Sequence, residues 1–261
     1  MYNFPEMRAV NMRFWEALRG LLIEAGIGEA PEALTFERSP VPDRLESEML
    51  FSQTCGYPLE TVFRGQAIRL AAPVYDVPAC KGPTHCAFFV VRADSPAQGL
   101  ADLKGSMFLL NSPVSNSGMN LPRRALADIA GGKPFFRGVI ETGGHPASLD
   151  RLLRGEGDVA SIDCVTYAFW SHYRPEAAAR VRILAETPAS PSIPFVTSVM
   201  TPPETVELLR AALHRLAHEP HYAAARAGLR IADIVEVPDA EYRGLLDYER
   251  EAAELGYPRL A

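Results

Sequence analysis

Long apolar runs and basic clusters are both missing from this sequence. No hydrophobic segment approaches the roughly 18 consecutive residues that a transmembrane helix requires. Lys and Arg number 26 against 32 Asp and Glu, which gives a formal net charge of -6, and the pair Arg123-Arg124 is isolated. These absences argue against insertion into a membrane and against a nucleic-acid partner.

A secretion signal is also missing from the residues as given. The first ten residues, MYNFPEMRAV, contain no basic region followed by an apolar stretch. The sequence therefore predicts a cytoplasmic protein as encoded, or a periplasmic one if a leader has been removed.

Cysteine is sparse, with four residues in 261. Cys80 and Cys86 flank the turn-prone segment KGPTH and are able to close a small disulfide loop, whereas Cys55 and Cys164 are distant in sequence. The C-x5-C spacing is a weak metal signal even with His85 beside it. We expect at least two of the four cysteines to be reduced, buried apolar residues.

What the sequence does contain is an alternation of strand-like and helical patterns, without internal repeats or low-complexity linkers. Hydrophobic residues make up 48% of the chain and charged residues 22%, as in globular proteins. Expected strands are 34–37, 68–74, 87–91, 106–111, 137–141, 158–163, 181–185 and 193–200. Expected helices are 6–26, 100–103, 164–173, 203–218, 221–227 and 239–255, together with one after Ser117 that has apolar positions at helical spacing from 121 to 129 and one within GGHPASLDRLLRGEG (143–157) with Pro146 at its first position. This alternation predicts an α/β protein with mostly parallel sheets flanked by helices.

The segment LLNSPVSNSGMNLPRRAL, residues 109–126, joins a strand to a helix through serines and asparagines. We expect Ser117 to be the N-cap, with Pro122 in the first turn and Gly118 allowing close backbone approach. A helix N-terminus with added hydroxyls suits a small anion. The chain has no Walker motif, so binding without phosphoryl transfer is the favoured interpretation, and an ordinary capped helix is the alternative.

Two further polar residues are expected near this loop. In parallel sheets, ligands lie beyond the carboxyl ends of the strands, where the 111–118 loop, His145 and Asp163 would all emerge. His145 alternatively only precedes the helix-starting Pro146, and Asp163 alternatively caps the following helix.

Several segments together give the chain a family resemblance. They are MYNFPEMRA at the start, SQTCGYPL at 52–59, APVYDVPACKGP at 72–83, DLKGSMFLLNSPVSNSG at 102–118, GHPASLDRLLRGEGDVASIDCVTY at 144–167 and PFVTSV at 194–199. In this order they extend from residue 1 to residue 199, about three quarters of the chain. The chain resembles the substrate-binding proteins of phosphate, phosphite and phosphonate ABC importers, which have the type 2 periplasmic-binding-protein fold.

The resemblance implies two lobes that close on a small oxyanion held between them. It predicts a first lobe over 1–93, a second over 94–186 that carries the anion loop, and a return of 187–261 to the first lobe. Hinges are expected near 92–95 and 185–190. An ABC permease is a possible partner, and neither a cofactor nor a metal is expected.

The resemblance also implies the ligand contacts. Ser115, Asn116, Ser117 and Gly118 would hold the anionic head, and Asn116 replaces a threonine-like residue of the family with an amide. His145 would approach from the second lobe, and Asp163 would meet an amino or hydroxyl group of the ligand. The residues that would face the anion from the first lobe are Tyr2, Thr54 and Tyr75, of which Tyr2 and Tyr75 are alternatively ordinary half-buried aromatic residues.

Other functional classes remain open from the residues alone. An enzyme on the same scaffold, in cofactor biosynthesis or with cysteine chemistry, would need an activated group, for which Cys55 with His145 is the candidate pair. A cytoplasmic ligand sensor is a further alternative. His214, His218 and His221 have a spacing that suits a metal, but Pro220 should end the helix before the third histidine, so a solvated helix face is favoured.

Overall fold

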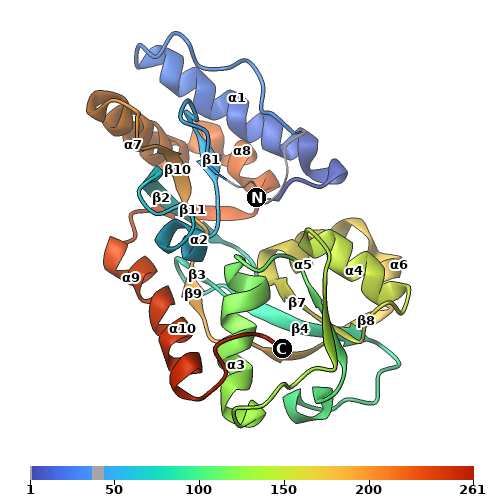
Figure 1. Cartoon of the computed structure of the whole chain (residues 1–261). Coiled ribbons are helices and arrows are strands. Elements are labelled where there is room, and N and C mark those ends of the chain that lie inside the picture. The colour runs from blue at the N-terminus through green and yellow to red at the C-terminus, as the bar shows by residue number, and fades with distance from the viewer. Residues whose placement is uncertain (1, 37–43) are drawn as a thin grey trace. The chain divides into compact units, whose positions relative to one another are not determined.

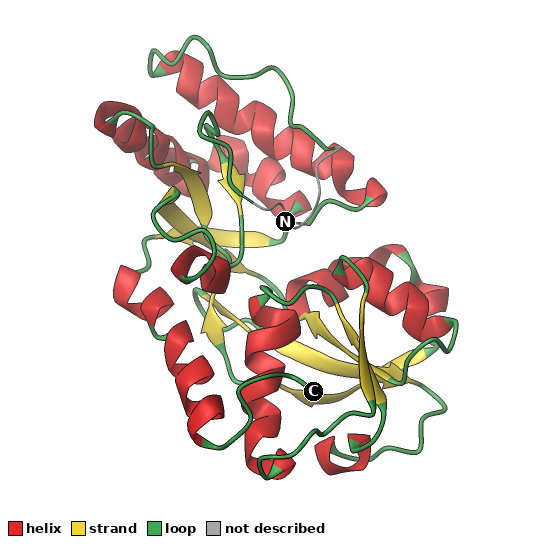
Figure 2. Ribbon diagram, viewed as in Figure 1, coloured by secondary structure: helices red, strands yellow, loops and turns green. Residues whose placement is uncertain are grey.

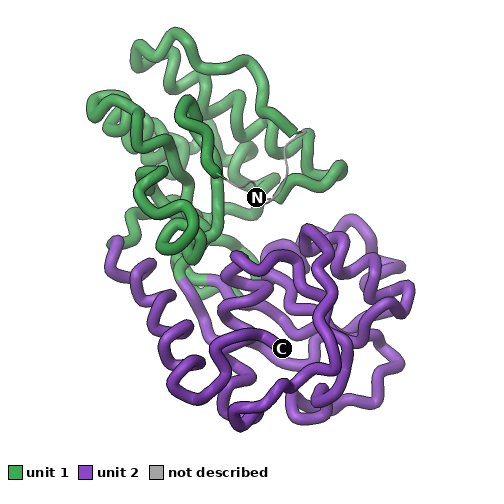
Figure 3. The backbone as a smooth tube through the Cα atoms, in the orientation of Figure 1, with its two compact units in different colours: residues 1–84, 191–238 green, residues 85–190, 239–261 purple. Residues whose placement is uncertain are grey.

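The computed structural model describes residues 2–36 and 44–261. The chain forms two compact units, unit 1 being Met1–Thr84 with Pro191–Pro238 and unit 2 being His85–Ser190 with Asp239–Ala261 (Figure 3). The chain passes from one unit to the other after Thr84, after Ser190 and after Pro238. Strands β3 (Thr84–His85) and β9 (Ser190–Pro191) contain the first two of these passages and form a two-stranded sheet.

Unit 1 is an antiparallel sheet covered by helices. Its strand order is β1-β10-β2-β11, and every pair in it is antiparallel. Its elements are η1 (Pro5–Met7), α1 (Arg8–Glu24), β1 (Ser52–Gln53), α2 (Gly56–Glu60), β2 (Ala67–Tyr75), β10 (Phe195–Ser198), α7 (Pro203–His218), η4 (Pro220–Tyr222), α8 (Ala223–Gly228) and β11 (Ile231–Val235) (Figure 1). Phe14, Leu18 and Leu22 of α1 are buried at helical spacing, which explains why this segment packs against α7 and α8.

Unit 2 is a mixed sheet with helices on both faces (Figure 2). The strand order is β6-β5-β7-β4-β8, in which β5 is parallel to β6 and β7 whereas β4 is antiparallel to β7 and β8. Its elements are β4 (Ala87–Arg92), η2 (Leu100–Leu103), β5 (Met107–Leu110), η3 (Asn116–Asn120), α3 (Leu121–Ala130), β6 (Gly138–Glu141), α4 (His145–Leu153), β7 (Val159–Asp163), α5 (Cys164–Tyr173), α6 (Pro175–Ala178), β8 (Val181–Glu186), α9 (Asp239–Arg243) and α10 (Leu245–Glu254). The crossovers through α3 and α4 run in opposite directions along the sheet, so these helices cover opposite faces.

The prediction of mostly parallel sheets is therefore wrong for unit 1 and holds for only half of the pairings in unit 2. Short connections, and the return of the chain from one unit to the other, allow strands that are neighbours in a sheet to run in opposite directions. The hydrophobic periodicity of a strand does not reveal its direction. Residues 34–36 form no strand, and Glu37 lies outside the described residues. Among the residues that the structure describes, no helix is both long and apolar enough to cross a membrane.

The unit boundaries differ from the predicted lobes in two respects. Residues 92–95, predicted to be a hinge, lie inside unit 2, because β4 is paired along its length with β7 and β8. The C-terminal segment 239–261 belongs to unit 2 and not to the first lobe. It is held there by a hydrogen bond from Asn120 Nδ2 to the carbonyl of Leu245 at 3.0 Å and by an ion pair of 2.6 Å between Arg124 and Glu251.

Candidate functional site

The helix that follows the serine-rich loop begins two residues earlier than predicted. Ser115, and not Ser117, is the N-cap, because its Oγ accepts a hydrogen bond from the backbone N–H of Gly118 at 3.0 Å. The first turn, η3, is a π turn in which the N–H of Asn120 donates to the carbonyl of Ser115 at 3.1 Å. The wider turn places Ser117 within the helix, so its hydroxyl is available for a side-chain contact.

Gly118 is needed because a buried side chain occupies the space of a Cβ. An added Cβ would lie 1.7 Å from Oδ1 of Asn111. Asn111 is itself fixed, since its Nδ2 donates to Ser115 Oγ at 3.1 Å. The close approach that the sequence predicted at Gly118 is thus an approach of the Asn111 amide to the start of the helix.

Replacing Gly118 with alanine is expected to displace Asn111 and to lower the free energy of unfolding by about 1–3 kcal/mol, the usual cost of overpacking. Urea unfolding followed by circular dichroism measures this change. Gly20→Ala is the matched control, because an added Cβ there has no neighbour within 4 Å and alanine is favoured inside a helix. Equal stability of Gly118→Ala and the wild type would contradict the packing argument.

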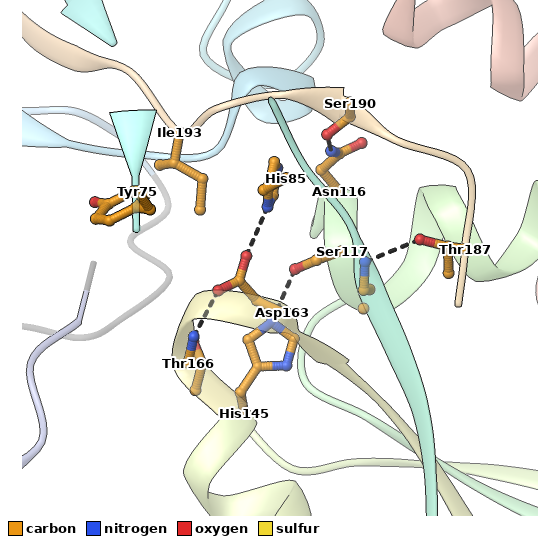
Figure 4. Close-up of polar contacts among 12 residues, drawn as sticks. Tyr75, His85, Asn116, Ser117, His145, Asp163, Thr166, Thr187, Ser190 and Ile193 are labelled. Atoms are coloured by element: carbon orange, nitrogen blue, oxygen red, sulfur yellow. Dashed lines mark hydrogen bonds and ion pairs between the residues drawn. The ribbon is translucent and has the colours of Figure 1, made fainter. Parts of the chain in front are cut away.

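Ser117 and His145 form the central contact of the site. Ser117 Oγ lies 2.9 Å from His145 Nε2 (Figure 4). Both side chains are buried, and burial lowers the pKa of His145 to about 4, so the imidazole is neutral near pH 7. The imidazole also interacts with the backbone carbonyl of Ser161, which opposes the lowering of its pKa. Within the described part of the chain, Asn111 Oδ1 has no partner at hydrogen-bond geometry.

The side chain of Asn116 is fully engaged inside unit 2. Its Nδ2 donates to Ser190 Oγ at 2.9 Å (Figure 4). Its Oδ1 accepts from Asn120 Nδ2 at 3.2 Å. Asn120 Oδ1 in turn accepts from Arg123 Nη2 at 2.7 Å. The expected amide contact between Asn116 and the anion would therefore compete with these bonds, whereas its backbone N–H lies at the start of the helix.

Arg123 supplies a positive charge that the sequence analysis did not assign to the site. It is 3% exposed and lies on the helix that starts at the loop. Its guanidinium also donates to the carbonyl of Pro258 at 3.1 Å and lies 3.6 Å from the Glu249 carboxylate. The amides of Asn120 and Asn116 connect this charge to the first turn of the helix.

Asp163 ends β7 and both of its carboxylate oxygens have partners. Oδ1 accepts from the N–H of Thr166 at 2.8 Å and so caps α5, which is the structural alternative considered above. Oδ2 lies 2.7 Å from His85 Nδ1 (Figure 4). A contact of Asp163 with an amino group of a ligand remains a prediction, and it would have to share these oxygens.

His85 and Asp163 form a buried ion pair. Burial alone would lower the pKa of His85 and raise that of Asp163, but their hydrogen bond and mutual attraction outweigh it. The pKa of His85 is therefore raised and that of Asp163 is lowered. The sequence analysis treated His85 only as a weak metal signal, and nothing in the segment CKGPTHC distinguishes a buried histidine from a loop residue.

The residues expected from the first lobe cluster in unit 1. Tyr2 and Tyr75 are in edge-to-face contact with their ring centroids 5.6 Å apart, and the Tyr75 hydroxyl accepts from Gln53 Nε2 at 3.0 Å. These three residues line a cavity of about 320 Å³ within unit 1. Thr54 follows β1, and its N–H donates to the carbonyl of Pro194 at 3.4 Å.

The residues of the enzyme and metal alternatives have other neighbours. Cys55 belongs to unit 1, whereas His145 belongs to unit 2 and contacts Ser117. His214 and His218 stack with ring centroids 4.3 Å apart, and α7 ends at His218, before Pro220, as the sequence predicted. Among the described residues, no group of three potential metal ligands is found.

The comparison with known families identifies the chain's relatives. The profile of a family described as "ABC transporter, phosphonate, periplasmic substrate-binding protein" matches residues 60–242, well over half of the chain. The chain belongs to this family. The search of curated proteins returned no match.

Solved structures support the same fold. A binding-protein component of an ABC phosphonate transporter from Pseudomonas aeruginosa superposes with a TM-score of 0.71 at 17% identity, over 93% of this chain and 83% of that one. PhnD1 from Prochlorococcus marinus, solved with methylphosphonate, gives a TM-score of 0.63 at 15% identity over 78% of both chains. XAC2383 from Xanthomonas citri, bound to a chloride ion, gives 0.60 at 20% identity over 78% of this chain and 76% of that one. The chain thus has the predicted α/β fold class of type 2 periplasmic binding proteins, with an antiparallel sheet in unit 1 and a mixed sheet in unit 2.

Proposed function

We propose that this family member captures a small phosphorus oxyanion, of the phosphonate, phosphate or phosphite class, for an ABC importer. The observation that carries the proposal is the buried cluster of Ser115, Ser117, Asn111 and His145 at the start of the helix, in which Asn111 Oδ1 lacks a protein partner among the described residues. Such a cluster can hold a small ligand with both donor and acceptor atoms.

The electrostatics of this end of the helix favour an anion. The first turn has backbone N–H groups without intrahelical partners and carries the positive end of the helix dipole. His145 is neutral near pH 7, so it offers one donor and one acceptor and adds no charge of its own. Arg123 lies further along the helix, but its guanidinium is 3.6 Å from the Glu249 carboxylate, so the proposal does not depend on its charge. In this proposal the ligand oxygens accept from the first turn and from Ser117, whose hydroxyl would turn away from His145.

The Asn111 Oδ1 acceptor limits which protonation state of the ligand can bind beside it. Asn111 Oδ1 can only accept a hydrogen bond, so a ligand that approaches it needs an O–H or N–H group. A singly protonated phosphonate or phosphate has a P–OH group and meets this need. The assignment of Gly118 to the anionic head is part of the same proposal, as are those of Tyr2, Thr54 and Tyr75 in unit 1. The observations favour a binding protein without catalysis, because among the described residues no carboxylate is hydrogen-bonded to His145, so the Ser117–His145 pair lacks the third group that orients the base of a serine nucleophile.

The experiment that tests the proposal is a thermal-shift screen followed by calorimetry. The panel contains phosphate, phosphite, methylphosphonate and 2-aminoethylphosphonate, with sulfate and acetate as the non-phosphorus anions. A ligand at about one hundred times its dissociation constant should stabilise the folded state by roughly 2.7 kcal/mol. Phosphorus NMR of the mixture should show the bound compound unchanged. A melting temperature that moves with none of the phosphorus compounds, or chemical conversion of one of them, would contradict the proposal.

Ser115→Ala and Ser117→Ala are each expected to weaken binding of the tightest compound of that screen. The loss of one hydrogen bond to a charged group is worth about 1.5–3 kcal/mol, which is roughly a 10- to 150-fold higher dissociation constant. Isothermal titration calorimetry measures both variants against the wild type. Ser47→Ala, at an exposed position of unit 1, is the control and should bind normally. Normal affinity in both loop variants would show that the loop only caps the helix.

A further inference from the structure

Two cysteines of unit 2 lie opposite each other on neighbouring segments. Strands β4 and β7 are antiparallel, and their ladder pairs Ala87 with Asp163. One step beyond that pair, Cys86 stands opposite Cys164, and the N–H of Cys164 donates to the carbonyl of Cys86 at 3.0 Å. Hydrogen-bonded pairs in antiparallel ladders have Cα atoms about 5.5 Å apart, which lies in the middle of the range that disulfides span.

The two side chains contact each other in a closed environment. Cys86 is 4% exposed and Cys164 is 0% exposed. Their thiols are hydrogen-bonded to each other, and this bond together with burial raises the pKa of the Cys86 thiol. Both cysteines belong to unit 2, whereas Cys55 and Cys80 belong to unit 1. Cys86 therefore has a thiol neighbour in its own unit other than Cys80, the partner that the sequence spacing indicated.

We propose that Cys86 and Cys164 are a disulfide-forming pair, which joins the start of β4 to the start of α5 under oxidising conditions. The family is described as periplasmic, and disulfides persist in that compartment. Cys86 and Cys164 are not joined by a disulfide in the structure, which corresponds to the reduced form of the pair.

The oxidant required is a low-molecular-weight or protein disulfide. The thiolate of one cysteine attacks this disulfide, forms a mixed disulfide and releases one thiol of the oxidant. The second cysteine then attacks the mixed disulfide, the bond between Cys86 Sγ and Cys164 Sγ forms, and the second thiol of the oxidant leaves. The two protons of the cysteines pass to the two released thiols. Because both thiols are buried in the folded unit, the thiol–disulfide exchange takes place before unit 2 has folded completely. Once unit 2 has folded, the disulfide is shielded from reductants.

The position of the pair connects it to the candidate site. His85 precedes Cys86 and Asp163 precedes Cys164, and the two segments are antiparallel, so the cysteine pair lies between the levels of His85 and Asp163. The bond would hold together the two segments that position His85 and Asp163.

The test is oxidative refolding followed by mass spectrometry. The full chain is unfolded in urea with reductant, refolded with reduced and oxidised glutathione, and then denatured and alkylated with N-ethylmaleimide. Trypsin cleaves after Arg64, Lys81 and Arg154, among other sites, so each cysteine lies on a separate peptide. We expect a product with two alkylated cysteines and one disulfide-linked peptide pair containing Cys86 and Cys164. We also expect a melting temperature several degrees above that of the protein refolded with reductant alone, because the bond closes a long loop.

Three variants make the assignment specific. Cys80→Ser should retain the linked peptides and the higher melting temperature, whereas Cys164→Ala and Cys86→Ala should lose both. The linkage in the wild type is measured independently of how these variants fold and of any ligand, so failure of the proposed oxyanion function would not affect it. Four alkylated cysteines in refolded wild-type protein, or a link between Cys86 and Cys80, would overturn the proposal.

Discussion

Replacing Asp163 with alanine is expected to lower the free energy of unfolding by about 3–5 kcal/mol, the usual cost of breaking a buried ion pair by removal of one partner. The carboxylate is 0% exposed, and its loss leaves His85, 2% exposed, without its 2.7 Å contact. It also removes the cap of α5, because the Thr166 N–H loses its acceptor. Urea unfolding at pH 6, monitored by circular dichroism, measures the change.

Two further variants separate the contributions. Asp163→Asn keeps an oxygen for the Thr166 N–H but removes the negative charge, so its cost should be smaller than that of alanine. Asp128→Asn is the control, because Asp128 is 62% exposed in its ion pair with Arg124 and such pairs contribute at most about 1 kcal/mol. A loss of stability in Asp163→Ala no greater than that in Asp128→Asn would refute the buried-pair interpretation.

The ion pair also fixes the pH range in which it stabilises the protein. The pKa of Asp163 is lowered on folding, so its contribution is present above the unfolded value of 3.8 and is lost as the pH falls through the folded value. The pKa of His85 is raised on folding, so its contribution is complete below 6.5 and is lost as the pH rises through the folded value. The two contributions are therefore both present between about pH 4 and 6.5.

The elements that the sequence predicts well are those with long, regular periodicity. Helices α1 and α7 and strands β2, β4 and β7 all lie where the apolar pattern places them. Strand direction and unit membership are not encoded in that pattern. The helix predicted at 239–255 is instead two helices, α9 and α10, separated at Gly244, and α10 packs on α3 through contacts that depend on tertiary structure.

The candidate site is only partly visible in the sequence for a similar reason. The serines and glycine of the 115–118 loop carry a local pattern, so their position before a helix is predictable. Asn111, Arg123 and His85 depend on contacts made after folding. The Cβ of Gly118 would collide with Asn111, Arg123 reaches Asn120 within the helix, and His85 meets Asp163 from a distant strand. No pattern within each separate segment predicts these pairings.

The second large effect concerns acid and His145. Burial lowers the pKa of this histidine from 6.5 to about 4, so between these values the unfolded chain binds a proton that the folded chain excludes. By thermodynamic linkage, the free energy of unfolding therefore decreases as the pH falls through this range, and the decrease is complete below about pH 4. At about 1.4 kcal/mol for each pH unit, the loss from this one group is about 3 kcal/mol.

The range from pH 4 to 6.5 isolates His145 from its charged neighbours. Asp163 and His85 both act electrostatically on His145, but the first titrates below 3.8 and the second above 6.5. The free energy of unfolding of the wild type, measured in urea from pH 7 to 4, should therefore decrease more steeply than that of His145→Gln. His172→Gln, at an exposed position of α5, should follow the wild type. Parallel pH profiles for wild type and His145→Gln would mean that His145 takes up its proton in the folded state, and that the site at the start of the helix becomes positively charged in mild acid rather than staying neutral.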